Sequence, residues 1–177
     1  MTLASADYVI RAAKLKRNVR DEQGAKTTLS ALLTATPFAG TCTLAVRAIK
    51  QQAARKATLE IRWRKIDLPA PQHRTLWLRK QKVRSVKTTL VEVRETKPPT
   101  GATPLHWVLY TSHDIHSIED ARRIIGYYEK RWLIEEYHKA LKTGCRIEDR
   151  QYQTSERLEK ITAFLGIQIL KRTPKCG

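Results

Sequence analysis

The sequence is poor in cysteine, and its three cysteines follow no pattern typical of disulfides or zinc. Cys42, Cys145 and Cys176 are odd in number and lack CxxC spacing, which argues against a disulfide framework and a zinc site. Long apolar runs are also missing, since no segment approaches the roughly 20 apolar residues that span a bilayer. The amino-terminal residues show no apolar core followed by a small-residue cleavage site, so a signal peptide is not expected. We therefore expect a cytoplasmic protein without membrane contact.

Acidic residues are scarce as well. The chain has 17 Asp and Glu against 34 Lys and Arg, a formal net charge of +17 over 177 residues. An excess of this size suits a polyanion such as nucleic acid, and the alternative is a ribosomal or otherwise nonspecific basic protein. With 41% hydrophobic residues in alternating segments, the chain is not a disordered basic tail. It is long enough for one domain with its own core.

The amino-terminal half predicts strands. Residues 6–14 (ADYVIRAAK) have a strand-like apolar centre, and the basic stretch after them, including RDEQGAK, predicts a turn or loop. From about residue 40 to 97 polarity alternates with a period of two. This alternation predicts an antiparallel sheet with one wet, basic face and ends at KPPTGATP (97–104). The four predicted strands are TCTLAVRA, ATLEIRWRKID, HRTLWLRK and TTLVEVRE. The apolar side of the second holds Leu59, Ile61 and Trp63, and its polar side holds Glu60, Arg62 and Arg64.

The carboxy-terminal half predicts one more strand and then helices. LHWVLYTS (105–112) is strand-like, and Ser117 followed by Glu119 and Asp120 is typical of a helix start. This helix is expected to run to about residue 142, with Gly144 as its stop. A final helix, 155–171, has four apolar residues at helical spacing, a pattern more typical of a core than of a site. They are Leu158, Ile161, Leu165 and Ile169.

The segment YYEKRWLIEEYHKALKTG (127–144) concentrates polar side chains on one helical strip. At about 100° per residue, Arg131, Glu135 and Lys142 fall within roughly 60° of Tyr128 around the helix axis. The opposite side is expected to seal the helix to a core; it holds Leu133, Ile134, Tyr137 and Leu141. From spacing alone, the strip is equally consistent with an exposed ladder of salt bridges that contributes little.

The order Tyr, two residues, Arg, three residues, Glu, six residues, Lys resembles the signature helix of the insertion-sequence-four (transposon-five-like) family of DDE transposases. The similarity includes Trp132 and the residues EEYHKA that follow it. PPTGATPLHWVLYTS resembles the strand that enters this helix, and DYVIRAAK resembles the strand before a β-rich insertion. The resemblance covers residues 6 to about 170 and is specific at 98–144.

This resemblance implies roles for individual residues. Glu135 would be the third carboxylate of a triad that binds two Mg²⁺ or Mn²⁺ ions, which clamp the attacking and leaving oxygens in DNA cleavage and strand transfer. Arg131 and Lys142 would hold DNA phosphates, with Tyr128 contacting the backbone beside them. Lys139, on the same helix, is a further expected DNA contact. Trp132 is more typical of packing, and His138 of a polar contact than of a metal ligand.

Trp107 would stack on a base flipped out of the transposon end, although a core tryptophan of the strand fits as well. The basic strand segments EIRWRK and WLRKQKVR are candidates for a DNA-facing side, since Lys and Arg contacts to phosphate dominate affinity without specifying sequence. Ordinary solvated strand faces explain them equally.

The implied fold is α/β: a partial ribonuclease H-like fold, comprising terminal strands and the catalytic helix, with an inserted antiparallel β subdomain. Residues 1–20 would be a core strand remnant and 21–104 the insertion. Residues 105–177 would hold a core strand, the catalytic-Glu helix and a final helix. The candidate triad aspartates do not stand in the family's context, so we expect a carboxy-proximal fragment without its dimerisation region. They are Asp7, Asp21, Asp67, Asp114, Asp120 and Asp149.

Two functional hypotheses follow. The first is a transposase domain that acts on transposon-end DNA in the bacterial nucleoid, catalytically incomplete and with no metal bound by this chain alone, from a family whose enzymes are homodimers. The second is a noncatalytic DNA-binding remnant, or a regulator that sequesters DNA or an intact transposase. An unrelated basic protein would require the similarity around the helix to be chance.

Overall fold

The computed structural model describes residues 6–48, 53–71, 73, 75–80, 83–144, 146, 154–157 and 159–163, with the backbone alone at positions 77, 78 and 144. The chain divides into two compact units, Met1–Gly126 and Tyr127–Gly177. The first is a mixed α/β unit built on a sheet, and the described part of the second is helical.

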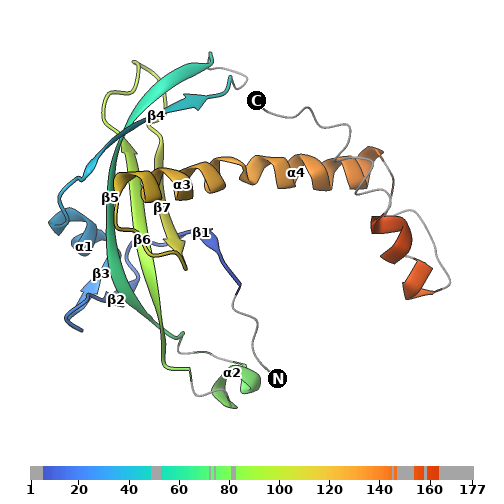
Figure 1. Ribbon diagram of the computed structural model, residues 1–177, viewed down its shortest axis with the longest axis horizontal. Coiled ribbons are helices and arrows are strands. Elements are labelled where there is room, and N and C mark those ends of the chain that lie inside the picture. Colours follow the sequence, from blue (N-terminus) through green and yellow to red (C-terminus); the bar gives the residue numbers. More distant parts are fainter. Residues whose placement is uncertain are drawn as a thin grey trace. The chain divides into compact units, whose positions relative to one another are not determined.

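One curved antiparallel sheet forms the first unit (Figure 1). Its strand order is β1-β7-β6-β5-β2-β3, and β4 pairs with β5 beside this path. The strands predicted in residues 6–14, 41–48, 57–67, 88–95 and 105–112 are confirmed. The described strands are β1 (Val9–Arg11), β2 (Asn18–Arg20), β3 (Lys26–Thr28), β4 (Gly40–Val46), β5 (Arg55–Pro69), β6 (Ser85–Glu95) and β7 (His106–Thr111).

The longest ladder joins β5 to β6, from Leu59 opposite Glu95 to Pro69 opposite Ser85. Alternation along these strands sends Leu59 and Ile61 to the same face as Val93, and all three are fully buried. Helix α3 (Ile118–Glu129) covers this face, crossing the sheet in Figure 1, and its apolar residues Ala121, Ile124 and Ile125 are buried. The apolar side predicted for the second strand is therefore the face on which α3 packs.

Helix α3 lies close to the sheet at Gly40 of β4. A Cβ atom at this position would lie 2.9 Å from Cδ1 of Ile118, at the start of α3. Arg122, on the same helix, donates a hydrogen bond from Nη2 to the carbonyl of Thr41 at 2.7 Å. The missing side chain thus lets the helix approach closely enough to bond the strand backbone.

The opposite face of the sheet packs on a short helix that the sequence did not suggest. Helix α1 (Leu29–Ala35) begins at Thr28, whose hydroxyl accepts a hydrogen bond from the Ala31 N–H, a normal N-cap. Seven buried apolar residues make up this second core. They are Val19, Leu29, Leu32, Leu33, Ile66, Leu90 and Val108.

The prediction of a wet, basic face is wrong at Arg62. This side chain is buried in an ion pair with Glu92 on β6, and the two side chains are only 9% and 4% exposed. Arg62 also donates to the Thr36 carbonyl at 2.9 Å and lies 4.4 Å from the centre of the Phe38 ring. Because the segment after α1 covers this face, the charge had to be paired rather than solvated.

A second buried acid closes the end of the same ladder. Glu95 bonds Arg55 of β5, and its Oε2 accepts the Leu105 N–H at 2.9 Å. Burial of Glu95 would raise the pKa of this carboxyl, but the hydrogen bonds from Arg55 and Leu105, with the charge of Arg55, outweigh it and lower the pKa. Both acids of β6, Glu92 and Glu95, thus bond an arginine of the neighbouring strand β5.

The strand predicted in HRTLWLRK is wrong, because Leu76–Lys80 form a short helix, α2. The physical reason lies in the ladder beside it. Since β5 pairs with β6 as far as Pro69 opposite Ser85, the residues between them form the connection of a hairpin. A helical turn there satisfies its own backbone groups without a partner strand.

The polar stretch predicted as a turn forms the tip of the β2–β3 hairpin. Asp21 accepts hydrogen bonds from the Gln23 and Ala25 N–H groups, and Gly24 has φ +84°, a conformation that favours glycine. Arg20 and Lys26, both exposed, are opposite each other in this hairpin. Like charges so placed destabilise strand pairing slightly.

The helix predicted to run to about residue 142 is interrupted. α3 ends at Glu129, α4 spans Arg131–Lys139, and a π-helical turn, η1 (Ala140–Gly144), follows. Lys130 lies at the break. Its carbonyl accepts a hydrogen bond from the Leu133 N–H at 2.9 Å, which spans three residues instead of the four of a regular α-helix. Gly144, the predicted stop, is the last residue of η1.

The described part of the predicted final helix, residues 155–157 and 159–163, is helical and includes Ile161. Leu158, Leu165 and Ile169 lie outside the described residues. Within the described part of the chain, no helix has the length and apolar character needed to cross a membrane.

Truncation of Glu92 tests the buried pair. Glu92→Ala leaves the Arg62 charge buried without a counter-ion, and we expect the free energy of unfolding, measured by urea denaturation, to fall by about 3 kcal/mol. The control is Glu22→Ala, which removes the exposed partner of Arg64 and should cost less than about 1 kcal/mol. Equal losses in the two variants would contradict a structural role for the buried pair.

Candidate functional site

The helix that leads to the candidate site has a well-formed start. Ser117 Oγ accepts the Asp120 N–H at 3.1 Å, while Asp120 Oδ2 accepts the Ser117 N–H at 3.2 Å. This is a reciprocal capping box, as the sequence predicted. The hydrogen bonds from His116 and Ser117 also lower the pKa of Asp120. Asp120 is thereby engaged as a cap.

Three of the predicted site residues come together in the second unit. Arg131 and Glu135, four residues apart on α4, form an ion pair between Nη1 and Oε1. The Arg131 guanidinium also lies 5.7 Å from the centre of the Tyr128 ring, a cation–π distance. Tyr128 is buried, at 8% exposed, whereas the side chains of Arg131 and Glu135 are 56% and 60% exposed. An accessible ion pair thus rests on a buried aromatic ring.

The charge of Glu135 acts on its neighbour. Hydrogen bonding and Coulomb attraction from Glu135, with a smaller contribution from Tyr128, raise the pKa of Arg131 further above its already high value. The guanidinium is therefore charged at every accessible pH, and phosphate binding by Arg131 would not depend on its protonation.

The two lysines expected to contact DNA are exposed, Lys139 on α4 and Lys142 on η1. Because η1 is a wider, π-helical turn, the uniform 100° spacing does not hold at Lys142.

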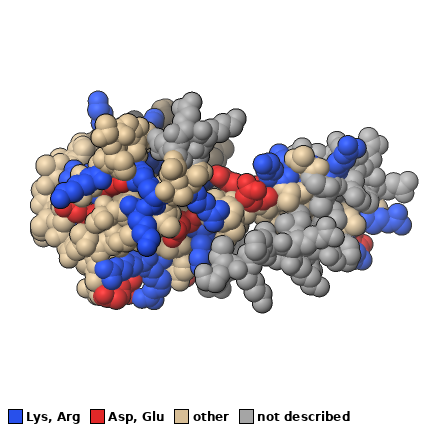
Figure 2. All heavy atoms as spheres, turned by 90° about the horizontal axis from the view of Figure 1, so that it is seen from above, with Lys and Arg blue, Asp and Glu red and all other residues tan. Residues whose placement is uncertain are grey.

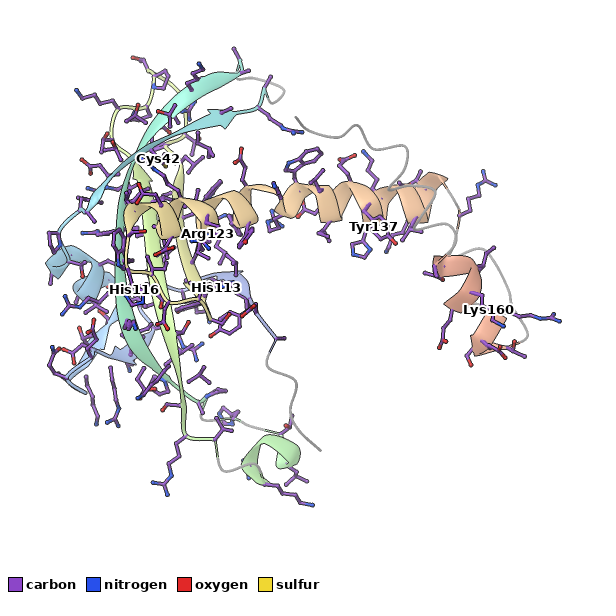
Figure 3. All side chains as sticks on the ribbon, in the orientation of Figure 1. Cys42, His113, His116, Arg123, Tyr137 and Lys160 are labelled. Carbon is purple, nitrogen blue, oxygen red and sulfur yellow. The ribbon has the colours of Figure 1, made fainter. Side chains whose placement is uncertain are left out.

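The opposite side of the helix differs from the prediction: Leu141 is buried, but Ile134 is 58% exposed. Leu133 and Tyr137 are half-buried. Tyr137, labelled on α4 in Figure 3, contacts the ring of His138 edge to face.

Trp107 belongs to the first unit, whereas Tyr128, Arg131 and Glu135 belong to the second. It lies on β7 opposite Val93 of β6 and is half-buried, which is compatible with packing and with a remaining accessible edge. Trp132, on α4, is also half-buried.

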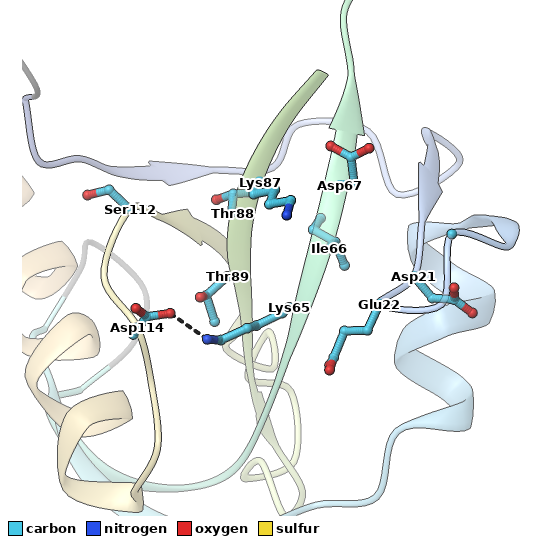
Figure 4. Close-up of a pocket in the computed structure, with 11 residues that line it drawn as sticks. Asp21, Glu22, Lys65, Ile66, Asp67, Lys87, Thr88, Thr89, Ser112 and Asp114 are labelled. Atoms are coloured by element: carbon cyan, nitrogen blue, oxygen red, sulfur yellow. Dashed lines mark ion pairs between the residues drawn. The ribbon is translucent and has the colours of Figure 1, made fainter. Parts of the chain in front are cut away.

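A polar cavity of about 640 Å³ lies on the sheet beyond the amino-terminal end of α3 (Figure 4). Lys65 bonds Asp114 across it at 2.6 Å, which lowers the pKa of Asp114. Glu22 pairs with Arg64 at 3.4 Å, and Asp21 caps the hairpin tip. Three acids that line the cavity, Asp21, Glu22 and Asp114, are thus engaged in local contacts.

The donor set for a divalent metal is incomplete within the described residues. No group of three or more His, Cys, Asp or Glu side chains there could hold a metal ion. Glu135 offers carboxylate oxygens of the type that Mg²⁺ prefers, but one of them is bonded to Arg131. One carboxylate with a guanidinium on it does not fit a two-metal site.

The family of the chain is settled by a comparison with protein-family models, in which the transposase DDE domain matches residues 3–167. The chain belongs to the DDE transposase family. The match includes both units, so the sheet and the Tyr128–Arg131–Glu135 cluster are parts of one family domain. A function in DNA transposition and a nucleic acid substrate follow from the family.

Several charged contacts of this DDE transposase domain were missed by sequence reasoning. Glu92 bonds both Arg62 and His106, the latter at 2.7 Å, so one acid joins three strands. Glu92 stands within TTLVEVRE, where it interrupts an otherwise apolar run, and that position was the available signal. Lys and Arg side chains are spread over the visible surface with acids set among them (Figure 2).

The exposed pair should contribute little to stability. We expect Glu135→Gln to leave the thermal midpoint, followed by circular dichroism, unchanged within error, because exposed i,i+4 pairs contribute little. Tyr128→Ala, which removes a buried ring, should lower it clearly. A large loss of stability in Glu135→Gln would mean that the pair is a structural contact rather than a site.

Proposed function

We propose that this chain is a transposon-five-like domain of the insertion-sequence-four family that takes part in cut-and-paste DNA transposition. In this proposal residues 1–20 and 105–177 form parts of a ribonuclease H-like core, and residues 21–104 form a β-rich insertion. The observation that carries it is the cluster of Tyr128, at the end of α3, with Arg131 and Glu135 of α4: a guanidinium between a buried tyrosine ring and an accessible carboxylate, inside a DDE transposase domain.

The residue types suit a DNA end. Arg131 presents a planar fork of N–H donors that matches a phosphate, and Tyr128 limits its freedom from below. Lys139 and Lys142 add mobile charges nearby that attract the backbone without reading sequence. Trp107 supplies an aromatic face for an unstacked base. These residues would bind and position the DNA.

Glu135 is proposed as the Glu of the DDE set. DDE transposases use divalent cations such as Mg²⁺ or Mn²⁺, which supply Lewis-acid stabilisation of the attacking and leaving oxygens. This chain's contribution would be one carboxylate next to a phosphate-binding arginine. The described residues hold no metal-binding group of three such side chains, and a second copy of the protein is proposed as its dimer partner.

A noncatalytic role is the second candidate, favoured by the lack of a metal-binding group of three or more His, Cys, Asp or Glu side chains among the described residues. A chain that keeps Arg131, Lys139 and Lys142 could bind transposon ends, or join an intact transposase, without cleaving DNA. The two candidates share DNA binding and differ in whether Glu135 is needed.

DNA binding is the first test. We expect the chain to bind duplex DNA with an affinity that falls as salt rises, because phosphate contacts release counterions. Arg131→Ala and Lys142→Ala should each weaken binding and reduce the salt slope by about one, as measured by fluorescence anisotropy at several salt concentrations.

The matched control is Lys160→Ala, which removes an exposed lysine of the same unit that pairs with Glu156 at 2.6 Å and should leave the affinity close to that of the original chain. An affinity unchanged between low and physiological salt would contradict DNA binding by either candidate function.

Cleavage tests whether this chain alone holds a complete active site. We expect no nicking of supercoiled DNA by this chain with Mg²⁺ or Mn²⁺, because one carboxylate beside an arginine binds divalent ions weakly. The assay compares the original chain with Glu135→Ala at equal concentration. Robust nicking that disappears in Glu135→Ala would show a complete active site and overturn the noncatalytic alternative.

A further inference from the structure

The arginine expected to hold phosphate already holds an anion of its own chain. Nη1 of Arg131 bonds Oε1 of Glu135 one helical turn away, and both side chains are more than half exposed. The same contact occupies the carboxylate that the DDE chemistry requires. In this arrangement the two functional groups of the strip neutralise each other.

We propose that the Arg131–Glu135 pair is an autoinhibitory contact, in which Glu135 competes with DNA phosphate for the Arg131 guanidinium and DNA binding must open the pair. The inference rests on the proposed function, since it takes Arg131 to be a phosphate contact. It adds that Glu135 sets the strength of that contact.

Charge makes the two anions alternatives. A phosphate bound bidentately uses two N–H groups of the guanidinium fork, and it brings a negative charge next to the Glu135 carboxylate. Like charges at such a distance repel, more strongly where water is excluded by a bound duplex. Phosphate and carboxylate therefore weaken each other's hold on Arg131.

Tyr128 gives the exchange a fixed base. Its ring is buried, so it stays in place, and the guanidinium lies over it at 5.7 Å. The exposed end of Arg131 can then turn from carboxylate to phosphate while keeping the aromatic contact. Opening the pair costs little because exposed pairs are weak, so the contact tunes affinity rather than preventing binding.

Linkage makes the competition measurable. If phosphate weakens the pair, then removing the charge of Glu135 must strengthen phosphate binding by the same factor. A general repulsion between Glu135 and DNA would also strengthen binding when the charge is removed. The two causes differ in whether the effect passes through Arg131.

A double-mutant cycle separates them. The affinity of the full chain for one duplex would be measured by anisotropy at fixed low salt without divalent ions, for the original chain, Glu135→Gln, Arg131→Gln and the double variant. We expect Glu135→Gln to tighten binding about two- to five-fold, Arg131→Gln to weaken it, and Glu135→Gln to have no effect in the Arg131→Gln background. Gln preserves the helix in each variant.

Glu136→Gln is the matched control, since it removes the same charge from the adjacent exposed residue of α4 and should tighten binding less than Glu135→Gln. Equal tightening by Glu135→Gln in both backgrounds, or by Glu136→Gln and Glu135→Gln, would overturn the autoinhibitory contact and leave the proposed function standing. No tightening by Glu135→Gln would overturn it as well. An Arg131→Gln chain that binds DNA as tightly as the original would instead refute the phosphate role of Arg131 in the proposed function.

Discussion

The ladder between β5 and β6 is the constraint on which the first unit depends. Its two long strands supply apolar residues to both faces of the sheet, so each face must be covered. Helix α3 covers one face and α1 with the segment after it covers the other. Once both faces are closed, charged residues along the ladder lose their water, and Arg62 with Glu92 and Arg55 with Glu95 become ion pairs. The fold thus dictates where charges pair.

Much of this architecture was predictable because it is local. The period of two in ATLEIRWRKID and TTLVEVRE matches β5 and β6, and Ser117 with Asp120 marks the start of α3. What failed was not local. TLWLRK alternates like a strand, but it lies in the connection between β5 and β6, which pair with each other. Arg62 alternates like a solvent-facing residue, but contacts with Thr36 and Phe38 cover it.

The candidate site divides in the same manner. Arg131 and Glu135 were expected on one strip because helical spacing alone brings residues four apart together, and the ion pair confirms that geometry. Spacing alone could not predict that Arg131 and Glu135 bond each other next to a buried Tyr128, because burial depends on tertiary packing. Spacing also failed for Ile134, which was expected on the packed side and is exposed, and for Lys142, where the π-helical turn departs from the regular spacing.

The opposed cations of the β2–β3 hairpin have a consequence for how the protein behaves among other molecules. β3 is an outer strand of the described sheet, and outer strands offer free backbone groups that other chains can join. A strand of a second copy that approached this edge would meet Lys26 of β3 and, on the next strand, Arg20 of β2. The same cations on both copies would repel each other. The slight cost that these charges impose on the hairpin therefore protects the folded protein against edge-to-edge aggregation.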